Sequence, residues 1–298
     1  MTIEEAIKNY THHLTTTRRL AAGTLKNYTT DLLSFASWVT ESGITDVSDL
    51  TARDIRGWQM ANIEAGISDG TIKRKLSSLR SWLKYLRKQK LLDHDIMAKI
   101  TAPKTPQHLP VFFKESEVEH IYEGALFSDD YAGERDKLIL RMLYETGMRR
   151  SELAGLMPTN IDFSAKTLKV LGKGNKERYI PVEEELLHNI EIYLALKEKE
   201  YPDSEALFVM NNGRAANAND VYRIVKRYMR GLSDAERVSP HVFRHTFATH
   251  LLNEGANIDA IKELLGHANL NATEIYTHNT REHLKETYKH AHPRAKKR

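Results

Sequence analysis

Three prolines stand close together about a third of the way along the chain, at Pro103, Pro106 and Pro110. A proline ring fixes the backbone and removes an amide hydrogen, so this segment cannot continue a helix and is stiffened in the way a linker is. The 298 residues are also enough for two domains, each with its own core. We therefore expect a first domain at residues 1–100, a linker at 101–112 and a second domain at 113–298.

Before this linker the chain repeats apolar residues at helical spacing in three segments. The first segment follows Thr24, a candidate N-cap, and the second follows Thr51, whose partner Asp54 can bind free backbone amides. The third covers residues 71–90. The apolar residues expected to face the core are Leu25, Tyr28, Leu32, Phe35 and Val39 in the first segment, Ile55 and Trp58 in the second, and Ile72, Leu76, Leu79, Leu83 and Leu86 in the third.

The third segment also carries eight Lys and Arg side chains and no acidic residue. Such a run repels itself unless something neutralises it, and DNA phosphates would do so. The charge of the whole chain is uneven in the same sense, with 16 Lys+Arg against 11 Asp+Glu in residues 1–110 and 28 against 29 afterwards. A solvated helix face is the alternative reading. The candidate DNA-binding residues are Lys73, Arg74, Lys75, Arg80, Lys84 and Arg87.

After the linker the pattern mixes helices with a small sheet. A helix at residues 135–144 is closed by Gly147 and followed by another from about Ser151. Two short strands, 167–171 and 178–182, flank a Gly-Lys-Gly-Asn turn and predict a β-hairpin. Further helices are expected to start near Glu183, Ala218, Pro240, Asn257 and Asn271. The expected fold is mainly α with a small β-sheet: a helical N-terminal domain and an α+β second domain.

Composition excludes several kinds of chemistry. The chain has no cysteine, which removes disulfides, thiolate metal sites and a cysteine nucleophile. The N-terminus does not resemble a secretory signal, and no apolar segment is long enough to cross a bilayer. With 41% hydrophobic and 28% charged residues, we expect a soluble globular protein with no membrane partner. The absence of cysteine favours a reducing, cytoplasmic location.

Five segments far apart in the sequence carry side chains suited to attack on a phosphodiester. Each segment alone has an ordinary explanation. Lys173 could be a lysine at a hairpin tip with no functional role, and any single histidine or tyrosine is one of 14 or 13 in the chain. The segments are Thr146-Gly147-Met148-Arg149-Arg150-Ser151-Glu152-Leu153, Gly172-Lys173-Gly174-Asn175-Lys176, His241-Val242-Phe243-Arg244-His245, Leu265-Gly266-His267 and Tyr276-Thr277-His278.

Together these residues form a set that can break a phosphodiester without a metal. Arg149 and Arg244 can each bind non-bridging phosphate oxygens through two nitrogens, where charge develops during attack. The His241-x-x-Arg244 spacing puts those two side chains on one helical face. His241 is the candidate for accepting the tyrosine proton, and His267 can donate a further hydrogen bond to the phosphate.

The remaining two roles concern the bonds that form and break. Tyr276 is the candidate nucleophile, which would become a covalent 3′-phosphotyrosine and store the energy of the broken bond. Lys173, on the hairpin tip, can protonate the departing 5′-oxygen. Religation would then need neither ATP nor metal, and no carboxylate cluster typical of a Mg²⁺ site is apparent. We therefore expect no cofactor.

These segments resemble the Arg, Lys, His-x-x-Arg, Leu-Gly-His and Tyr boxes of the tyrosine recombinases, the integrase family. The steps of 24 residues from Arg149 to Lys173, 23 from Arg244 to His267 and 9 from His267 to Tyr276 are similar to those of the family. Residues 240–252 and the ending His292-Pro293-Arg294-Ala295 resemble the bacterial Xer branch. The family pattern selects Arg149 rather than Arg150, and Lys173 rather than Lys176. Glu152 is expected to support the arginine from behind.

The resemblance implies a helical SAM-like core-binding domain and a catalytic domain that together clamp duplex DNA. It implies a homo- or hetero-tetramer of recombinases on two specific sites, and strand exchange through a Holliday junction. The helix at residues 281–290 would dock on a neighbouring protomer. The usual task of this branch is the resolution of chromosome dimers at a dif-type site, activated by an FtsK-type DNA translocase of the division septum.

Three other readings share parts of this pattern. An integrase or invertase of a mobile element would carry the same catalytic boxes, because motifs identify chemistry better than biological role. A type IB topoisomerase has a similar tyrosine and cation cluster but differs in size and ending. A non-catalytic DNA-binding homologue would be expected to lack Tyr276 or an arginine, and this chain has them all.

Overall fold

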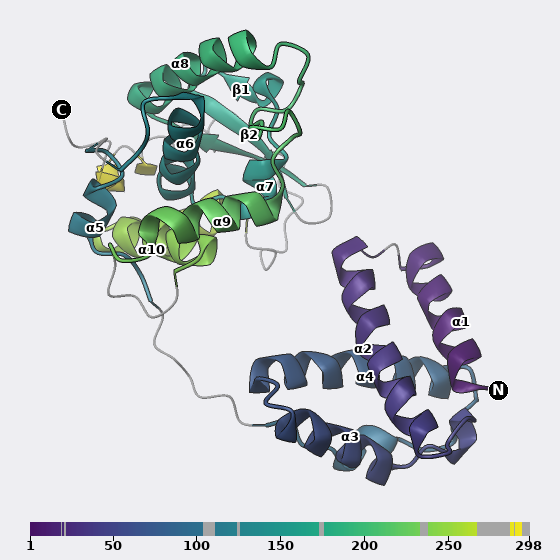
Figure 1. Cartoon of the computed structure of the whole chain (residues 1–298). Helices are drawn as coiled ribbons and strands as arrows, with labels where there is room; N and C mark the ends of the chain where they lie inside the picture. Colours follow the sequence, from purple (N-terminus) through teal and green to yellow (C-terminus); the bar gives the residue numbers. More distant parts are fainter. Residues whose placement is uncertain are drawn as a thin grey trace. The chain divides into compact units, whose positions relative to one another are not determined.

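The computed structural model describes residues 1–18, 20, 22–103, 111–123, 126–172, 176–232, 238–266, 287–288 and 290–293. The chain divides into two compact units, Met1–His108 and Leu109–Arg298 (Figure 1). Separate clusters of buried apolar residues form the cores of the two units. Most of the expected linker, 104–110, lies outside the described residues. Among the helices that are described, none is both long and apolar enough to span a membrane.

Four helices build the first unit: α1 (Ile3–Thr16), α2 (Ala22–Glu41), α3 (Ala52–Glu64) and α4 (Asp69–Lys88). Short 3₁₀ turns at Val47–Asp49 and Ile96–Lys99 complete it. As predicted, Thr51 is the N-cap of α3, and its backbone N–H donates to Asp54 at 2.8 Å. The sequence reading did not assign α1, although Thr2 and Glu5 form the same kind of capping box at its start.

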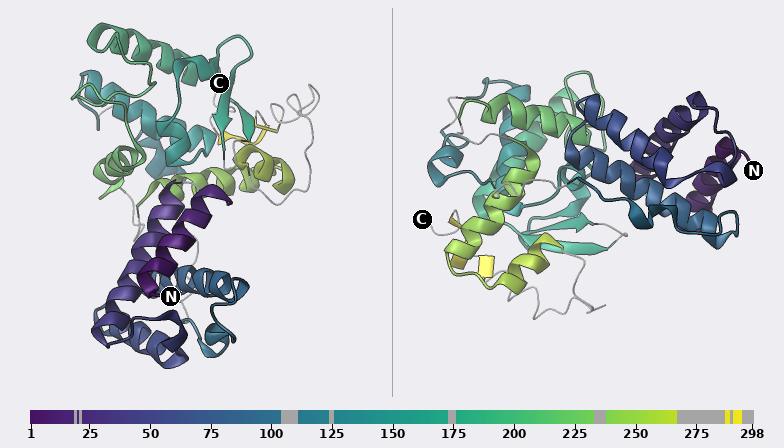
Figure 2. Two further views of the ribbon diagram at one scale, coloured as in Figure 1. Left: turned by 90° about the vertical axis from the view of Figure 1, so that its right-hand side faces the viewer. Right: turned by 90° about the horizontal axis from the view of Figure 1, so that it is seen from below.

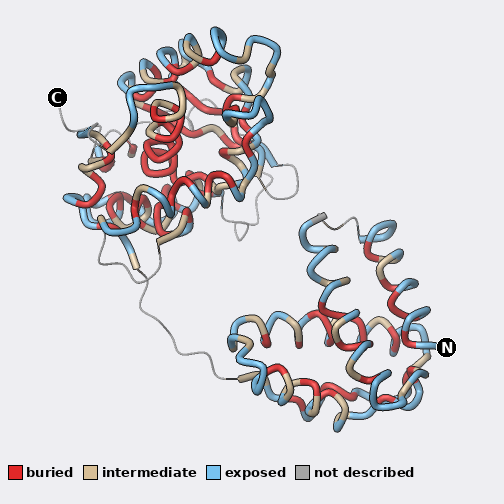
Figure 3. Tube along the Cα trace, in the orientation of Figure 1, coloured by how far each residue is buried: buried red, intermediate tan, exposed pale blue. Residues whose placement is uncertain are grey.

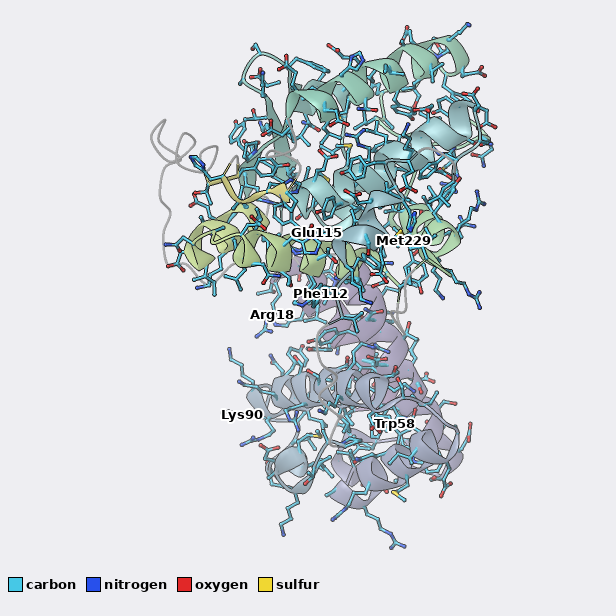
Figure 4. All side chains as sticks on the ribbon, turned by 90° about the vertical axis from the view of Figure 1, so that its left-hand side faces the viewer. Arg18, Trp58, Lys90, Phe112, Glu115 and Met229 are labelled. Carbon is cyan, nitrogen blue, oxygen red and sulfur yellow. The ribbon has the colours of Figure 1, made fainter. Side chains whose placement is uncertain are left out.

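The predicted apolar faces of these helices form the core of the unit. Leu32, Phe35 and Val39 of α2 are fully buried, as is the stripe of α4 from Ile72 to Leu86. Trp58 of α3 lies inside the unit while Lys90, just beyond α4, is exposed (Figure 4). One detail of the prediction is wrong: α2 begins at Ala22, so Thr24 lies inside its first turn and is not the N-cap.

The second unit contains a three-stranded antiparallel sheet in the order β1 (Ile161–Asp162), β2 (Thr167–Leu171) and β3 (Glu177–Pro181) (Figure 2). Leu168 pairs with Ile180, so these apolar side chains share the buried face of the sheet. The predicted hairpin is therefore confirmed, with β3 one residue earlier than expected. Its tip, residues 173–175, lies outside the described residues.

The helices of this unit surround α6 (Tyr131–Thr146), which is buried along most of its length (Figure 3). Its neighbours include α7 (Arg150–Ala154), α8 (Glu184–Glu200), α9 (Ala218–Met229) and α10 (Pro240–Asn253), all in contact with it. The short α5 (Glu115–Glu119) precedes α6, a 3₁₀ turn at Pro158–Asn160 follows α7, and α11 (Ile258–Leu265) packs on α10.

The helix boundaries in the second unit agree closely with those predicted. Gly147 ends α6 in the left-handed conformation, with φ of 59°. The helices expected near Glu183, Ala218, Pro240 and Asn257 each begin within a residue of those positions. The α6 helix begins at Tyr131, four residues before the expected 135, and a start near Asn271 falls outside the described residues. The fold class, mainly α with a small sheet, is confirmed.

Candidate active site

Arg149 stands directly before α7, at the turn where the chain leaves the buried helix α6. Its backbone N–H donates to Oε2 of Glu152 at 2.8 Å, and its guanidinium donates to Oε1 of the same carboxylate at 2.7 Å. This arrangement closes the first turn of α7 and fixes the arginine at the same time. The side chain of Arg149 is still 34% exposed, whereas Glu152 is almost fully buried. One side of the guanidinium therefore stays open to a ligand.

Arg244 and His241 lie one turn apart on α10, on the same helical face. The guanidinium of Arg244 donates to the carbonyl oxygens of Gly147, at 2.9 Å, and Leu265, at 2.6 Å. Among the described residues no carboxylate forms an ion pair with Arg244. Neutral carbonyl groups thus hold the guanidinium in place, and the carboxylate of Glu152 acts on its charge without forming an ion pair with it.

The electrostatics of these side chains show that they share one neighbourhood. Burial, helped by the nearby charges of Arg149 and Arg178, lowers the pKa of Arg244 to about 10, so it stays protonated at neutral pH. Partial burial of His241, followed by the charges of Arg150 and Arg244, lowers the pKa of this imidazole below its ordinary value. A neutral imidazole is thus favoured beside a group of fixed cations.

Arg178 on β3 is part of this neighbourhood, and the sequence reading did not select it. It is 4% exposed and binds both oxygens of Glu152, at 3.1 and 2.7 Å, while its Nε donates to the carbonyl of Leu264 at 2.9 Å. Burial opposes ionisation of Glu152, but the hydrogen bond and charge of Arg178 outweigh it and lower the pKa of the carboxyl. The sequence contains a signal for this burial, because strand alternation places Arg178 on the same inward face as Ile180. An arginine on a buried strand face requires a partner for its charge.

Lys173, His267 and Tyr276 lie outside the described residues. The described residues beside the first two lie close to the arginine cluster. The Cα of Gly172 is oriented so that an added Cβ would lie 3.6 Å from Arg178 and 3.9 Å from Glu152. Gly266 follows Leu265, whose carbonyl binds Arg244, and its own Cβ position lies 3.1 Å from Arg178. Within the described part of the chain, no group of three His, Asp or Glu side chains could hold a metal.

Several cations of the basic helix α4 have partners within the first unit. Arg74 binds the buried carboxylate of Asp31, Lys75 binds Asn62, and Arg87 binds Asp95 at 3.0 Å. These three contacts neutralise or occupy half of the six candidate DNA-binding residues. Among the described residues the other three form no ion pair or side-chain hydrogen bond, and they are exposed: Lys73, Arg80 and Lys84.

With Lys88, these three cations form a single stripe along α4, which we call the free basic stripe (Lys73, Arg80, Lys84 and Lys88). Their spacing of seven, four and four residues keeps them on one side of the helix. A cleft of about 710 Å³ lies beside the stripe, between α4, α1 and α2, and none of the described residues that line it is acidic. Its lining includes Arg18, Arg80, Lys84 and Lys88 together with Tyr10, Tyr28 and Tyr85.

The first unit carries a cleft lined by cations, and in the second unit Arg149, Arg244 and His241 lie close enough for their charges to interact. Clustered cations of this kind suit the binding of a phosphate-bearing polyanion. Comparisons with known proteins identify the class of protein to which this arrangement belongs. The Phage integrase family model matches residues 112–283, and the model of the phage integrase N-terminal SAM-like domain matches residues 7–90.

Relatives align over nearly the whole chain. Tyrosine recombinase XerC of Oceanobacillus iheyensis is 35% identical over 298 residues, covering 98% of this chain and 97% of the relative. Tyrosine recombinase XerC of Bacillus subtilis is also 35% identical, with 99% of each chain covered. The chain belongs to the phage integrase family, in its Xer-type branch of tyrosine recombinases, and is a site-specific recombinase.

Solved structures share the fold. A XerH site-specific recombinase, in a complex described as post-cleavage on a palindromic difH substrate, aligns with a TM-score of 0.69 and 24% identity, covering 91% of this chain and 81% of that one. The Tn1549 transposon integrase, solved with circular-intermediate DNA, aligns with a TM-score of 0.70 and 21% identity, covering 95% and 98%.

Proposed function

We propose that this chain cuts and rejoins double-stranded DNA at a specific site through a covalent link to Tyr276. The observation that carries the proposal is the convergence of Arg149 with His241 and Arg244, which follow it by more than ninety residues, at one partly exposed, cation-rich place. Within the described residues, Arg149 shares the carboxylate of Glu152 with Arg178, and Arg244 binds two carbonyl oxygens, so neither arginine has a carboxylate of its own. Such a place suits an anion with several oxygens.

The chemistry follows from these charges. The phenolic oxygen of Tyr276 attacks phosphorus and passes its proton to His241, while the bond from phosphorus to the 5′-oxygen breaks. Lys173 gives the leaving oxygen a proton, and Arg149 and Arg244 stabilise the charge on the non-bridging oxygens, with His267 as a further donor. The 3′-phosphotyrosine then reacts with another 5′-hydroxyl in the reverse step. The fixed arginines supply the charge stabilisation, and the energy of the bond is conserved.

The biological role proposed is resolution of chromosome dimers at a dif-type site, in the cytoplasm. The full-length similarity to proteins named XerC supports it. We propose further that four protomers, of this chain alone or with a related recombinase, exchange strands through a Holliday junction under the control of an FtsK-type septal translocase. The integrase of a mobile element is the rival role, and the genes that flank the locus discriminate between them.

Tyr276→Phe tests the chemical proposal. On a nicked duplex whose short 5′-fragment diffuses away after cleavage, the unmodified chain should accumulate a covalent protein–DNA product, and the variant should bind DNA equally well but form none. Tyr288→Phe is the matched control, because the hydroxyl of Tyr288 is buried and donates to the carbonyl of Glu145 at 2.9 Å. Covalent product that persists in the Tyr276 variant contradicts the assignment.

A further inference from the structure

Arg178 joins three segments that each lead to a residue of the proposed chemistry. It lies on β3, one strand of the hairpin. It binds both oxygens of Glu152, the partner of Arg149, and it donates to the carbonyl of Leu264, near the end of α11. Its side chain fills the space that a Cβ on Gly266 would enter, at 3.1 Å. A buried guanidinium with all these contacts has little freedom to move.

The charges at Glu152 give this contact a specific consequence. The carboxylate is 5% exposed and accepts hydrogen bonds from two guanidinium groups, those of Arg149 and Arg178. A buried carboxylate requires about one full countercharge, and Arg178, with two bonds at 4% exposure, supplies it. Arg149 is attached through a single side-chain nitrogen, so its remaining N–H groups and most of its charge stay available.

We propose that Arg178 is a positioning residue for strand cleavage, which neutralises and orients Glu152 so that Arg149 keeps its place and its charge for the scissile phosphate. This inference rests on the proposed function. Without Arg178, Arg149 would be the remaining guanidinium among the described residues that hydrogen-bonds Glu152, and a paired guanidinium is drawn toward the carboxylate and away from the ligand. The role thus concerns charge on a non-bridging oxygen, which can be tested apart from stability.

The test compares two nicked duplexes that differ at the scissile position only. One carries the ordinary phosphodiester, and the other carries a methylphosphonate, in which a methyl group replaces one non-bridging oxygen and removes its charge. Arg178→Met should slow cleavage of the phosphodiester by about 100-fold, the effect of losing one aligned cation. It should slow cleavage of the methylphosphonate by less than about threefold, because that substrate has less charge to stabilise.

Arg135→Met is the matched control for the loss of a buried arginine. Arg135 is 3% exposed and binds the buried Asp136 through Nε and one terminal nitrogen, with no contact to Glu152 or Arg149. If this variant lowers the fraction of folded protein, the cleavage rates of both substrates should fall by the same factor. Equal slowing of both substrates by Arg178→Met would show that Arg178 only stabilises the fold, and would overturn the inference.

A second test compares cleavage by Glu152→Gln with cleavage by the double variant that also carries Arg178→Met. It does not depend on the folding of the single Arg178 variant. If Arg178 acts through the charge of Glu152, adding Arg178→Met to Glu152→Gln should slow phosphodiester cleavage by less than about threefold, a non-additive result. A further loss of tenfold or more in the double variant would overturn the inference. Absence of covalent product from the unmodified chain would instead overturn the proposed function itself, and the two failures are therefore distinct.

Discussion

The guanidinium of Arg244 on α10 donates a hydrogen bond to the carbonyl oxygen of Gly147, the residue that ends α6. Gly147 stands two residues before Arg149, so this contact sets the distance between the two arginines through the backbone itself. A second bond, to the carbonyl of Leu265, ties the same guanidinium to the end of α11. Residues of three helices thus meet at Arg244, and among the described residues no carboxylate forms an ion pair with it.

Removal of either arginine should slow cleavage without unfolding the protein. Arg149→Ala and Arg244→Ala are each expected to reduce the rate of covalent product formation by about 100-fold, because each loses a fixed cation at the developing charge. Arg244→Lys should not restore the rate, since an ammonium group cannot bind two carbonyls and a phosphate in the same fork geometry. Single-turnover cleavage measures the effect, with thermal unfolding as the control. A loss below threefold would contradict the assignment.

The pH dependence of cleavage should report His241. Partial burial and the neighbouring Arg150 and Arg244 disfavour the charged ring and lower the pKa of His241 from its ordinary value. As the proton acceptor it must be neutral, so the rate should be constant at neutral pH and fall only as the pH drops through this lowered pKa. Single-turnover rates between pH 5 and pH 8 measure the profile, and His241→Gln should remove the acid limb. An acid limb centred above pH 7 would exclude this role.

The free basic stripe should account for much of the salt dependence of DNA binding. Neutralising Lys73, Arg80 and Lys84 should weaken affinity and make the slope of log K against log salt shallower by about one unit per cation. Arg87→Ala, on the same helix, should change the slope much less because Asp95 already pairs with Arg87. Titrations at several salt concentrations provide the slopes. An unchanged slope in the triple variant would mean that this face is only solvated.

Gly147 should tolerate no side chain. Its φ is 59°, and an added Cβ would lie 2.5 Å from Phe247 and 2.8 Å from Leu265, both in the core. Gly147→Ala should therefore destabilise the protein by about 1–3 kcal/mol and also slow cleavage, because it moves the carbonyl that Arg244 binds. Gly255→Ala separates backbone strain from steric overlap, since Gly255 has φ of 85° but nothing within 4 Å of the added Cβ. Denaturant unfolding measures the free energy of unfolding of both variants. Equal losses of stability in the two variants would show that packing at Gly147 is unimportant.

The sequence determined much of the local structure, because the relevant signals involve residues close together along the chain. The apolar stripe of α4, the Thr51–Asp54 capping box, the glycine that ends α6 and the alternation in the hairpin are each set by contacts within a few residues. It also placed His241 and Arg244 on one face, since their spacing equals about one helical turn.

Only the tertiary structure decided which charges remain available. Arg74 and Arg87 look like Arg80 in the sequence, but carboxylates from elsewhere in the chain, Asp31 and Asp95, bind the first two. Likewise the sequence predicts only that Arg178 belongs to a strand, whereas the fold brings it into contact with Glu152, 26 positions away. Local patterns follow from backbone geometry, whereas the pairing of charges depends on long-range packing that brings distant carboxylates and carbonyls within hydrogen-bonding distance.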